Sequence, residues 1–319
     1  MLRLPLRSLP STEVMAKARS MLGTGWQAEY ARLAAQLLAE LPGVADRPTV
    51  LAVTGAQGTG KSTLAAHLRS VVAALGGAAA VLSLDDLYLS RAERAALAAA
   101  VHPLLRTRGV PGTHDLDLGM RLLAALTGRA GLIGVPAGRL DRDDSIAIPR
   151  FDKGLDERLP VSQWRTQRLP VSLVIVEGWC LALPPQSTEA LQRPINQLEQ
   201  DEDGDGRWRR WVNARLTLDY QAFFGCFDAV VALLPPDFEA VHRWRRGQEL
   251  GLPAERRMGA AALARFVAHY ERLTRHGLAS WPQRADWCVW LAPDHHIARI
   301  THRRAAPGAV SNPPDQQRE

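Results

Sequence analysis

Cysteine and lysine are both scarce in this sequence, and no long apolar run is present. The three cysteines, Cys180, Cys226 and Cys288, lie far apart without a CxxC pair. This spacing argues against a disulfide scaffold or a structural zinc site and favours a reducing compartment such as the cytoplasm. No stretch approaches the ~20 apolar residues of a membrane-spanning helix, so we expect no membrane partner. With 319 residues, 46% hydrophobic and 23% charged, the chain is not intrinsically disordered as a whole.

Positive charge comes almost wholly from arginine, because the only lysines are Lys17, Lys61 and Lys153. The formal net charge of +6 alone fits a nucleic acid, an anionic membrane or a phosphorylated small molecule as partner. The segment RWRRW (207–211) mixes cations and aromatics as RNA-binding segments do. A helix that packs its tryptophans inward explains the same pattern better, and we expect no nucleic-acid partner.

Short apolar runs alternate with helical patterns through most of the chain. Five runs have the length and composition of buried parallel strands. They are residues 49–55, 78–86, 171–178, 228–236 and 287–293. Strands that alternate with helices predict right-handed crossovers, and so a three-layer α/β/α fold with a mostly parallel central sheet. In such sheets, ligands bind beyond the carboxyl ends of the strands.

The remaining segments predict additions to this core. Residues 25–41 have apolar residues at helical spacing and end at Pro42-Gly43. The N-terminal twenty residues are typical of either a transit peptide or a plain extension. The expected divisions are an N-terminal helical extension (1–44), a main domain (45–304) with a substrate-side insertion (about 102–170), a polar loop (184–206) and a helical lid (about 237–276), and a flexible tail (305–319).

The segment GAQGTGKS (55–62) matches the phosphate-loop pattern G-x-x-x-x-G-K-[ST] between a predicted strand and a predicted helix. Its glycines let backbone N–H groups converge on phosphate oxygens, and the helix N-terminus adds partial positive charge. Lys61 is expected to reach the β- and γ-phosphates of ATP, and Ser62 to help hold Mg²⁺. The alternative is an ordinary glycine turn, which pattern and context together disfavour. The candidate nucleotide-binding residues are Gly55, Ala56, Gln57, Gly58, Thr59, Gly60, Lys61, Ser62 and Thr63.

The phosphate loop does not by itself distinguish ATPases, GTPases and small-molecule kinases. The N-K-x-D motif that reads guanine in Ras-type GTPases is absent from the sequence. The third strand ends in VIVEGW (174–179), with one carboxylate, where an AAA-type ATPase has Asp-Glu. Both absences argue against those two classes.

Carboxylates lie at the ends of the second and third predicted strands. Asp85 is the candidate general base, because a carboxylate near the γ-phosphate can orient an acceptor hydroxyl and take its proton. Asp86 is assigned to the acceptor side. The alternative is that both acids cap a helix. Glu177 is a candidate to bind Mg²⁺ directly or through water, the alternative being a surface acid at a strand end.

The segment HPLLRTRGVPGTHD (102–115) is a candidate acceptor loop. Arg106 and Arg108 offer guanidinium groups for a carboxylate or phosphate. His114 and Asp115 offer further polar contacts, unless Asp115 simply begins a helix, and Lys153 adds a cation from a second loop. These side chains predict a small acidic alcohol as substrate, the alternative being surface arginines and a helix cap.

The segment VHRWRRGQE (241–249) places three arginines on a predicted helix. Arg245 is the candidate to neutralise charge on the transferring phosphoryl group when a lid closes and excludes water. The alternative is a solvated basic helix face.

Several segments together resemble the plant-type D-glycerate 3-kinase family over most of 45–292. They are LAVTGAQGTGKST, SLDDLYLSRAER, HPLLRTRGVPGTHD, IPRFDKGLDERLP, VIVEGW and WVNARLTLDYQAFF. More distantly, the family resembles uridine kinase, phosphoribulokinase and bacterial pantothenate kinase. The resemblance implies a P-loop NTPase fold and ATP-dependent phosphorylation of a small alcohol, with glycerate as first candidate. It also implies that Asp85 is the base, Tyr88 lines the acceptor pocket and Glu177 assists the metal.

Two residues depart from the family pattern. Leu87 stands where these kinases usually carry Phe, and Gly247 follows Arg246 where relatives usually continue the helix without Gly. The first is expected to reshape the acceptor pocket, and the second to interrupt the helix and loosen the lid. Two further functions stay open at this point: a kinase for another small alcohol, such as a nucleoside or a pantothenate-like compound, and a regulatory P-loop ATPase that binds a partner protein.

Overall fold

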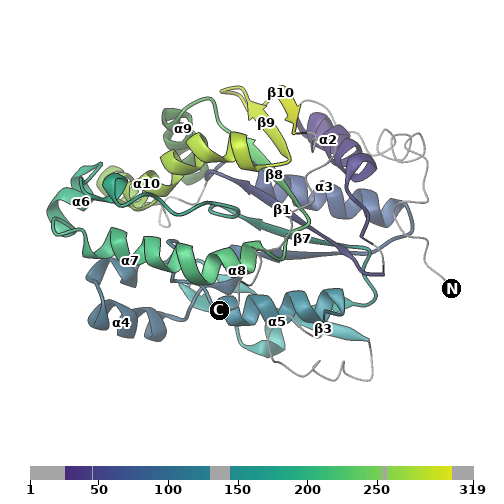
Figure 1. The fold of residues 1–319 in the computed structure, drawn as a ribbon, viewed down its shortest axis with the longest axis horizontal. Coiled ribbons are helices and arrows are strands. Elements are labelled where there is room, and N and C mark those ends of the chain that lie inside the picture. The colour runs from purple at the N-terminus through teal and green to yellow at the C-terminus, as the bar shows by residue number, and fades with distance from the viewer. Residues whose placement is uncertain (1–25, 45, 130–143, 252, 254–256, 304–319) are drawn as a thin grey trace, which may run out of the picture.

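A sheet of six strands runs through the protein in the order β10-β9-β8-β1-β7-β2 (Figure 1). The computed structural model describes residues 26–44, 46–129, 144–251, 253 and 257–303. All neighbouring strands are parallel except β9 and β10, which pair antiparallel. The strands are β1 (Thr49–Gly55), β2 (Ala79–Ser83), β7 (Leu173–Gly178), β8 (Ala229–Leu234), β9 (Trp287–Leu291) and β10 (Ile297–His302).

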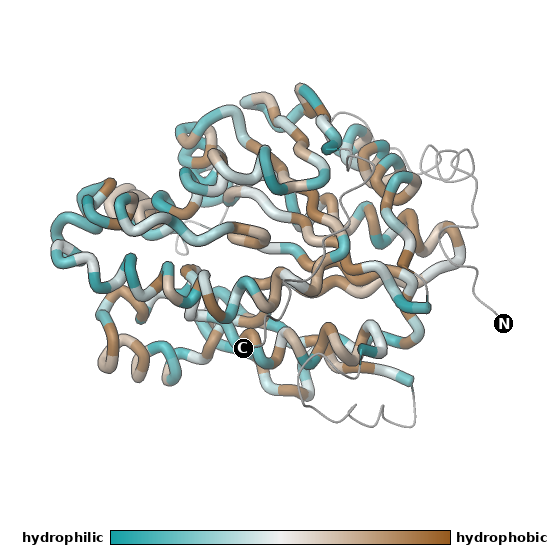
Figure 2. Tube along the Cα trace, viewed as in Figure 1, coloured by the Kyte–Doolittle hydropathy of each residue, from teal (hydrophilic) through white to brown (hydrophobic). Residues whose placement is uncertain are grey.

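The central strands are apolar on both faces because helices cover both. In β1, Val50 and Ala52 pack into one core cluster, whereas Leu51 and Val53 pack into another on the opposite face. Figure 2 shows hydrophobic residues along these strands and on the helices beside them. This arrangement is the predicted three-layer α/β/α fold with a mostly parallel sheet.

The helices on the two faces come from different parts of the chain. α2 and α3 cover one face, and residues of α5, α7, α8 and α10 pack into the cluster on the other (Figure 1). The helices are α2 (Trp26–Glu40), α3 (Lys61–Ala74), α4 (Arg91–Ala100), α5 (Leu116–Thr127), α6 (Gln197–Glu202), α7 (Arg207–Arg215), α8 (Gln221–Phe224), α9 (Phe238–Leu250) and α10 (Ala260–Arg284). A π-helical segment, Leu216–Tyr220, joins α7 to α8. None of the helices in the described ranges is both long and apolar enough to span a bilayer.

The predicted insertion contains two small antiparallel pairs of strands. β3 (Ser145–Ile148) pairs with β6 (Arg165–Arg168), and β4 (Phe151–Asp152) pairs with β5 (Glu157–Arg158) to form a hairpin. Short 3-10 helical segments lie at Leu84–Leu87, Pro103–Arg106, Val161–Gln163 and Glu189–Leu191.

Some predicted boundaries differ from the structure. The run predicted as a strand over 78–86 ends at Ser83, where the chain enters a 3-10 turn. The predicted polar loop contains α6, whose Glu199 makes a buried ion pair with Arg272 of α10. The N-terminal helix α2 shares a core cluster with β1 and α3. The predicted flexible tail lies outside the described residues.

Candidate active site

The loop between β1 and α3 is a tight turn whose shape depends on glycine. Gly58 and Gly60 both have φ of 84°, a left-handed conformation in which a side chain is strained. A Cβ at Gly58 would lie 2.7 Å from Cβ of Trp244, and one at Gly60 would lie 3.0 Å from the ring of Tyr30. Helix α9 and the N-terminal helix α2 therefore both pack directly on this loop.

Lys61 and Glu177 both lie near the carboxyl ends of β1 and β7 and line the same cavity. The Lys61 ammonium donates to the backbone carbonyl of Ala56 over 2.8 Å, so it folds back over the loop. Burial lowers the pKa of Lys61, although Glu177 and Asp85 oppose this effect. The buried Glu177 accepts a 2.6 Å hydrogen bond from Ser83. Burial raises the pKa of Glu177, and the charge of Lys61 partly offsets that rise.

Asp85 is held by two donors at the 3-10 turn that follows β2. Its carboxylate accepts hydrogen bonds from the ammonium of Lys153 at 2.6 Å and from the hydroxyl of Tyr88 at 2.7 Å. Burial raises the pKa of Asp85, but Lys153, Tyr88 and Lys61 together outweigh it and hold that pKa below its ordinary value. The carboxylate is therefore ionised at neutral pH, as a general base must be.

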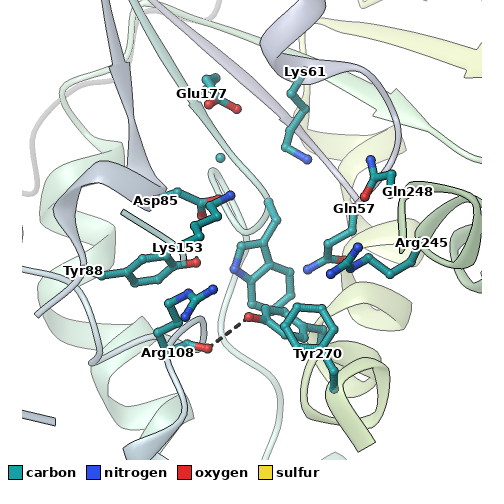
Figure 3. Close-up of a pocket in the computed structure, with 13 residues that line it drawn as sticks. Gln57, Lys61, Asp85, Tyr88, Arg108, Lys153, Glu177, Arg245, Gln248 and Tyr270 are labelled. Carbon is teal, nitrogen blue, oxygen red and sulfur yellow. Dashed lines mark hydrogen bonds and ion pairs between the residues drawn. The ribbon is translucent and has the colours of Figure 1, made fainter. Parts of the chain in front are cut away.

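These groups open into a cavity of about 300 Å³, which we call the main cavity (Figure 3). It is bounded by the phosphate loop, the 3-10 turn, the β4–β5 hairpin, α9 and α10, and it holds four cationic side chains and two carboxylates. The lining residues are Gln57, Lys61, Asp85, Tyr88, Arg108, Lys153, Glu177, Gly178, Trp179, Arg245, Gln248, Phe266 and Tyr270.

Two arginines enter the main cavity from opposite sides. Figure 3 shows Arg108 beside Tyr88, and Arg245 across the cavity beside Gln57. Arg108 forms an ion pair with Asp156, and Arg245 forms one with Glu249. Each guanidinium also lies over an aromatic ring, 5.6 Å from the centroid of Phe151 for Arg108 and 5.0 Å from that of Phe266 for Arg245. Both cations are thus anchored at the cavity wall.

Comparisons with known proteins point to kinases. No family model matches the chain. The chain is 32% identical over 245 residues to the uncharacterized kinase mug58 of Schizosaccharomyces pombe, covering 74% of this chain and 83% of that protein. It is 28% identical over 232 residues to the chloroplastic D-glycerate 3-kinase of Arabidopsis thaliana, covering 70% of this chain and 46% of that protein. A solved D-glycerate 3-kinase from Cryptococcus neoformans shares the fold, with a TM-score of 0.64, 23% identity and coverage of 92% and 99% of the two chains.

The chain belongs to the glycerate kinase-like family of P-loop kinases. It is an ATP-dependent small-molecule kinase, a phosphotransferase with an alcohol group as acceptor. The P-loop fold and the family, both predicted from the sequence, are confirmed.

Not every predicted acceptor residue of this kinase reaches the main cavity. Arg106 is exposed and does not line it, while its backbone carbonyl accepts a hydrogen bond from the buried Arg94. Asp115 caps the N-terminus of α5 and forms an ion pair with Arg158, which is the structural alternative that the sequence left open. Of the two arginines predicted to bind the acceptor, only Arg108 lines the main cavity.

His114 lies behind the cavity wall. Its buried ring stacks on that of Tyr88, with centroids 4.6 Å apart, and Nδ1 lies 2.5 Å from the hydroxyl of Tyr220. Burial lowers the pKa of His114 to about 3, so the ring is neutral at physiological pH. It supports Tyr88 and does not line the cavity.

The cavity also has lining residues that the sequence did not single out. Tyr270 of α10 donates a 3.0 Å hydrogen bond to the backbone carbonyl of Arg108 (Figure 3). Trp179, directly after β7, donates to the backbone carbonyl of Gly109 over 3.0 Å. Gln248 comes from α9. Trp179 ends the strand motif VIVEGW and could have been found there, whereas helical periodicity does not mark which face of α9 or α10 meets a ligand.

The two departures from the family pattern have other consequences than we expected. Leu87 is buried in the core beside α5 and does not line the main cavity. Gly247 does not interrupt α9, which continues to Leu250. A glycine in a helix costs about 1 kcal/mol relative to alanine, which weakens a helix without ending it.

Oxygen donors suited to Mg²⁺ lie beside the phosphate loop. Ser62, Asp85, Asp86 and Glu177 line one neighbouring cavity. In the described part of the chain, no group of three or more His, Cys, Asp or Glu side chains is arranged to hold a metal by itself. Magnesium in kinases keeps several waters and binds through one or two carboxylates together with nucleotide phosphates. These residues therefore fit a Mg²⁺ that arrives with the nucleotide.

Proposed function

We propose that this kinase transfers the γ-phosphoryl group of ATP to D-glycerate, giving 3-phosphoglycerate and ADP. The observation that carries this proposal is the convergence of Asp85, Lys153 and Arg108 in the main cavity, next to Lys61 of the phosphate loop. A small hydroxy acid offers a carboxylate to a guanidinium and a hydroxyl to a base. The name of the Arabidopsis relative points to the same substrate.

In this proposal the acceptor carboxylate binds Arg108. The guanidinium is fixed by Asp156 and by the ring of Phe151, so little side-chain freedom is lost when an anion binds. A volume of about 300 Å³ is at the lower end of the range for small-molecule pockets, which runs from about 300 to 1,000 Å³. The transferred phosphoryl group needs part of this space, which favours an acceptor smaller than a nucleoside.

Asp85 then orients the acceptor hydroxyl and takes its proton as the oxygen–phosphorus bond forms and the bond to ADP breaks. Lys61 and Arg245 stabilise negative charge on the phosphoryl oxygens. Ser62 and Glu177 are the residues that would hold Mg²⁺, which would neutralise further negative charge on the nucleotide phosphates. The remaining loop residues, Gly55 to Thr63, are proposed to bind the nucleotide phosphates through backbone N–H groups.

We place this activity in the cytoplasm, since Cys180, Cys226 and Cys288 are free and buried, which fits a reducing compartment. We propose that the substrate-side insertion and the helical lid both serve this activity. The β4–β5 hairpin of the insertion supplies Lys153 to the main cavity, and α9 supplies Arg245. The chain is expected to act without nucleic acid or membrane, and its oligomeric state is left open.

The test is a screen of small alcohols and hydroxy acids with ATP and Mg²⁺, read by NMR of the products. We expect D-glycerate to be phosphorylated at its 3-hydroxyl, and the Lys61→Ala variant to be inactive. Transfer to a nucleoside or pantothenate-like compound in place of glycerate would reassign the acceptor. Hydrolysis of ATP that responds only to a partner protein would indicate a regulatory ATPase.

A further inference from the structure

The neighbouring cavity, whose oxygen donors fit Mg²⁺, has a volume of about 430 Å³ and meets the main cavity at the Asp85–Lys153 ion pair; we call it the second cavity. It shares only Asp85, Lys153 and Glu177 with the main cavity. Its other walls come from α3, β2, β6 and the segment between β3 and β4. Neither Arg108 nor the aromatic side chains of the main cavity line it, so an acceptor held by Arg108 would leave most of this space free.

The second cavity carries more positive charge than its acids neutralise locally. Arg69, Arg150 and Arg165 line it from three different segments. Arg165 lies 3.3 Å from Asp86, whose other oxygen accepts the backbone N–H of Phe151. Within the described ranges, the guanidinium groups of Arg69 and Arg150 make no hydrogen bond or ion pair. Two arginines are thus available to an anion at a site where Asp85 and Asp86 are already paired with Lys153 and Arg165.

We propose that the second cavity binds the phosphate group of a phosphorylated small molecule that is neither ATP nor the acceptor. Arginine forks match phosphate oxygens in pairs, and two forks from separate segments suit a dianion better than a single carboxylate. Ala65 and Ala66 of α3 and Val81 of β2 give the cavity an apolar side, which accommodates the carbon part of an ester. The site does not depend on which alcohol the kinase phosphorylates.

Occupancy of this site is expected to affect catalysis through Lys153. The side chain of Lys153 is 60% exposed and lies on the wall of both cavities. An anion bound beside Arg150 attracts the Lys153 ammonium away from Asp85. The proposed base then loses one of the two donors that hold its carboxylate.

The test is a binding titration with glycerol 3-phosphate, inorganic phosphate and, as the uncharged control, glycerol. The full chain is first saturated with Mg²⁺ and a non-hydrolysable ATP analogue, so that the phosphate loop is filled. Heat of binding is measured for the wild type, R69Q/R150Q, R108Q and R121Q. Arg121 is an exposed arginine on α5 that lines neither cavity, so R121Q is the matched control.

We expect both phosphate compounds, and not glycerol, to bind the wild type, R108Q and R121Q alike. Binding to R69Q/R150Q should be at least about tenfold weaker, as for loss of charge-assisted hydrogen bonds. Unchanged affinity of R69Q/R150Q, loss of binding in R108Q instead, or no binding to the wild type overturns the proposal. Binding of the ATP analogue shows that each variant is folded, and single variants replace the double one if it is not. Because no turnover is measured, the result is independent of whether glycerate is the acceptor.

Discussion

The hydroxyl of Tyr88 donates a hydrogen bond to the carboxylate of Asp85 over 2.7 Å, from a side chain that is itself buried. Behind Tyr88, the ring of His114 stacks against it and is held in turn by Tyr220. Tyr220 is the last residue of the π-helical segment, and its hydroxyl also accepts the backbone N–H of Gly112 over 2.9 Å. The orientation of the proposed base is therefore fixed by a stack of buried rings that begins one layer behind the cavity.

Replacing Asp85 by Asn tests the base directly. The amide keeps the size of the side chain but cannot take a proton, so kcat is expected to fall by about 10²-fold or more. Binding of ATP, measured by titration, should stay near that of the wild type because the phosphate loop is unchanged. A near-normal kcat would assign the base to another residue.

Replacing Tyr88 by Phe removes only the hydroxyl that reaches Asp85. Hydrogen bonds to charged groups contribute about 1.5–3 kcal/mol, so a decrease in kcat/KM of roughly 10- to 100-fold is expected. This hydrogen bond lowers the pKa of Asp85, so its loss should also move the acid limb of the pH–rate profile to higher pH. A reduced rate with an unshifted acid limb would mean that Tyr88 acts on the substrate and not on the base.

Replacing Lys153 by Met is expected to shift the same acid limb further than Y88F does. Burial raises the pKa of Asp85, and Lys153 provides the largest of the opposing effects. Without the ammonium, the folded-state pKa of Asp85 rises, so the active, ionised form is lost at a higher pH as the solution is acidified. The measurement is kcat/KM for the acceptor across the acid range. An acid limb at lower pH than that of the wild type would contradict the assigned charge relationship.

Sequence reasoning predicted the sheet well because its five parallel strands are local, continuous apolar runs. It missed β10, whose residues are half-buried or exposed and whose order comes from pairing with β9. It also missed α6 in an acidic stretch, since that helix is stabilised by the distant Arg272 of α10 and not by its own composition. Tertiary contacts of this kind leave no periodic signal in a sequence.

At the active site, too, the sequence predicts what local patterns determine and misses what tertiary contacts determine. The phosphate loop, Asp85 and Glu177 all lie at the carboxyl ends of parallel strands, so topology alone brings them together. The segment 102–115 carries several polar residues in a row, but the backbone directs Arg108 into the main cavity and turns Asp115 toward the helix cap. Tyr270 is absent from every motif because only the packing of α10 against this loop places it there.

Arg245 and Arg246 are adjacent on α9, yet only Arg245 lines the main cavity, while Arg246 is exposed. Replacing Arg245 by Gln is expected to lower kcat by about 10²-fold, because charge on the transferring phosphoryl group loses a fixed cation. The R246Q variant, with the same chemical change one residue away, should keep the wild-type rate. Binding of ATP serves as the folding check, since Glu249 loses its ion-pair partner in R245Q. Equal effects of the two substitutions would indicate a general influence of basic charge on α9.

The stability of the α10 wall of the cavity is expected to depend on Glu199. This fully buried carboxylate accepts two hydrogen bonds of 2.6 Å from Arg272, two residues beyond Tyr270 on α10. Replacing Glu199 by Gln leaves the guanidinium charge buried and unpaired, which should lower the free energy of unfolding by about 3–5 kcal/mol.

Glu202 on the same helix provides the matched control. It forms an exposed ion pair with Arg265, and such pairs contribute about 0–1 kcal/mol, so E202Q should unfold at nearly the wild-type urea concentration. Urea unfolding followed by tryptophan fluorescence measures both variants. Equal destabilisation by E199Q and E202Q would show that the buried pair is not what holds α6 against α10, and that the wall containing Tyr270 is stabilised by apolar packing alone.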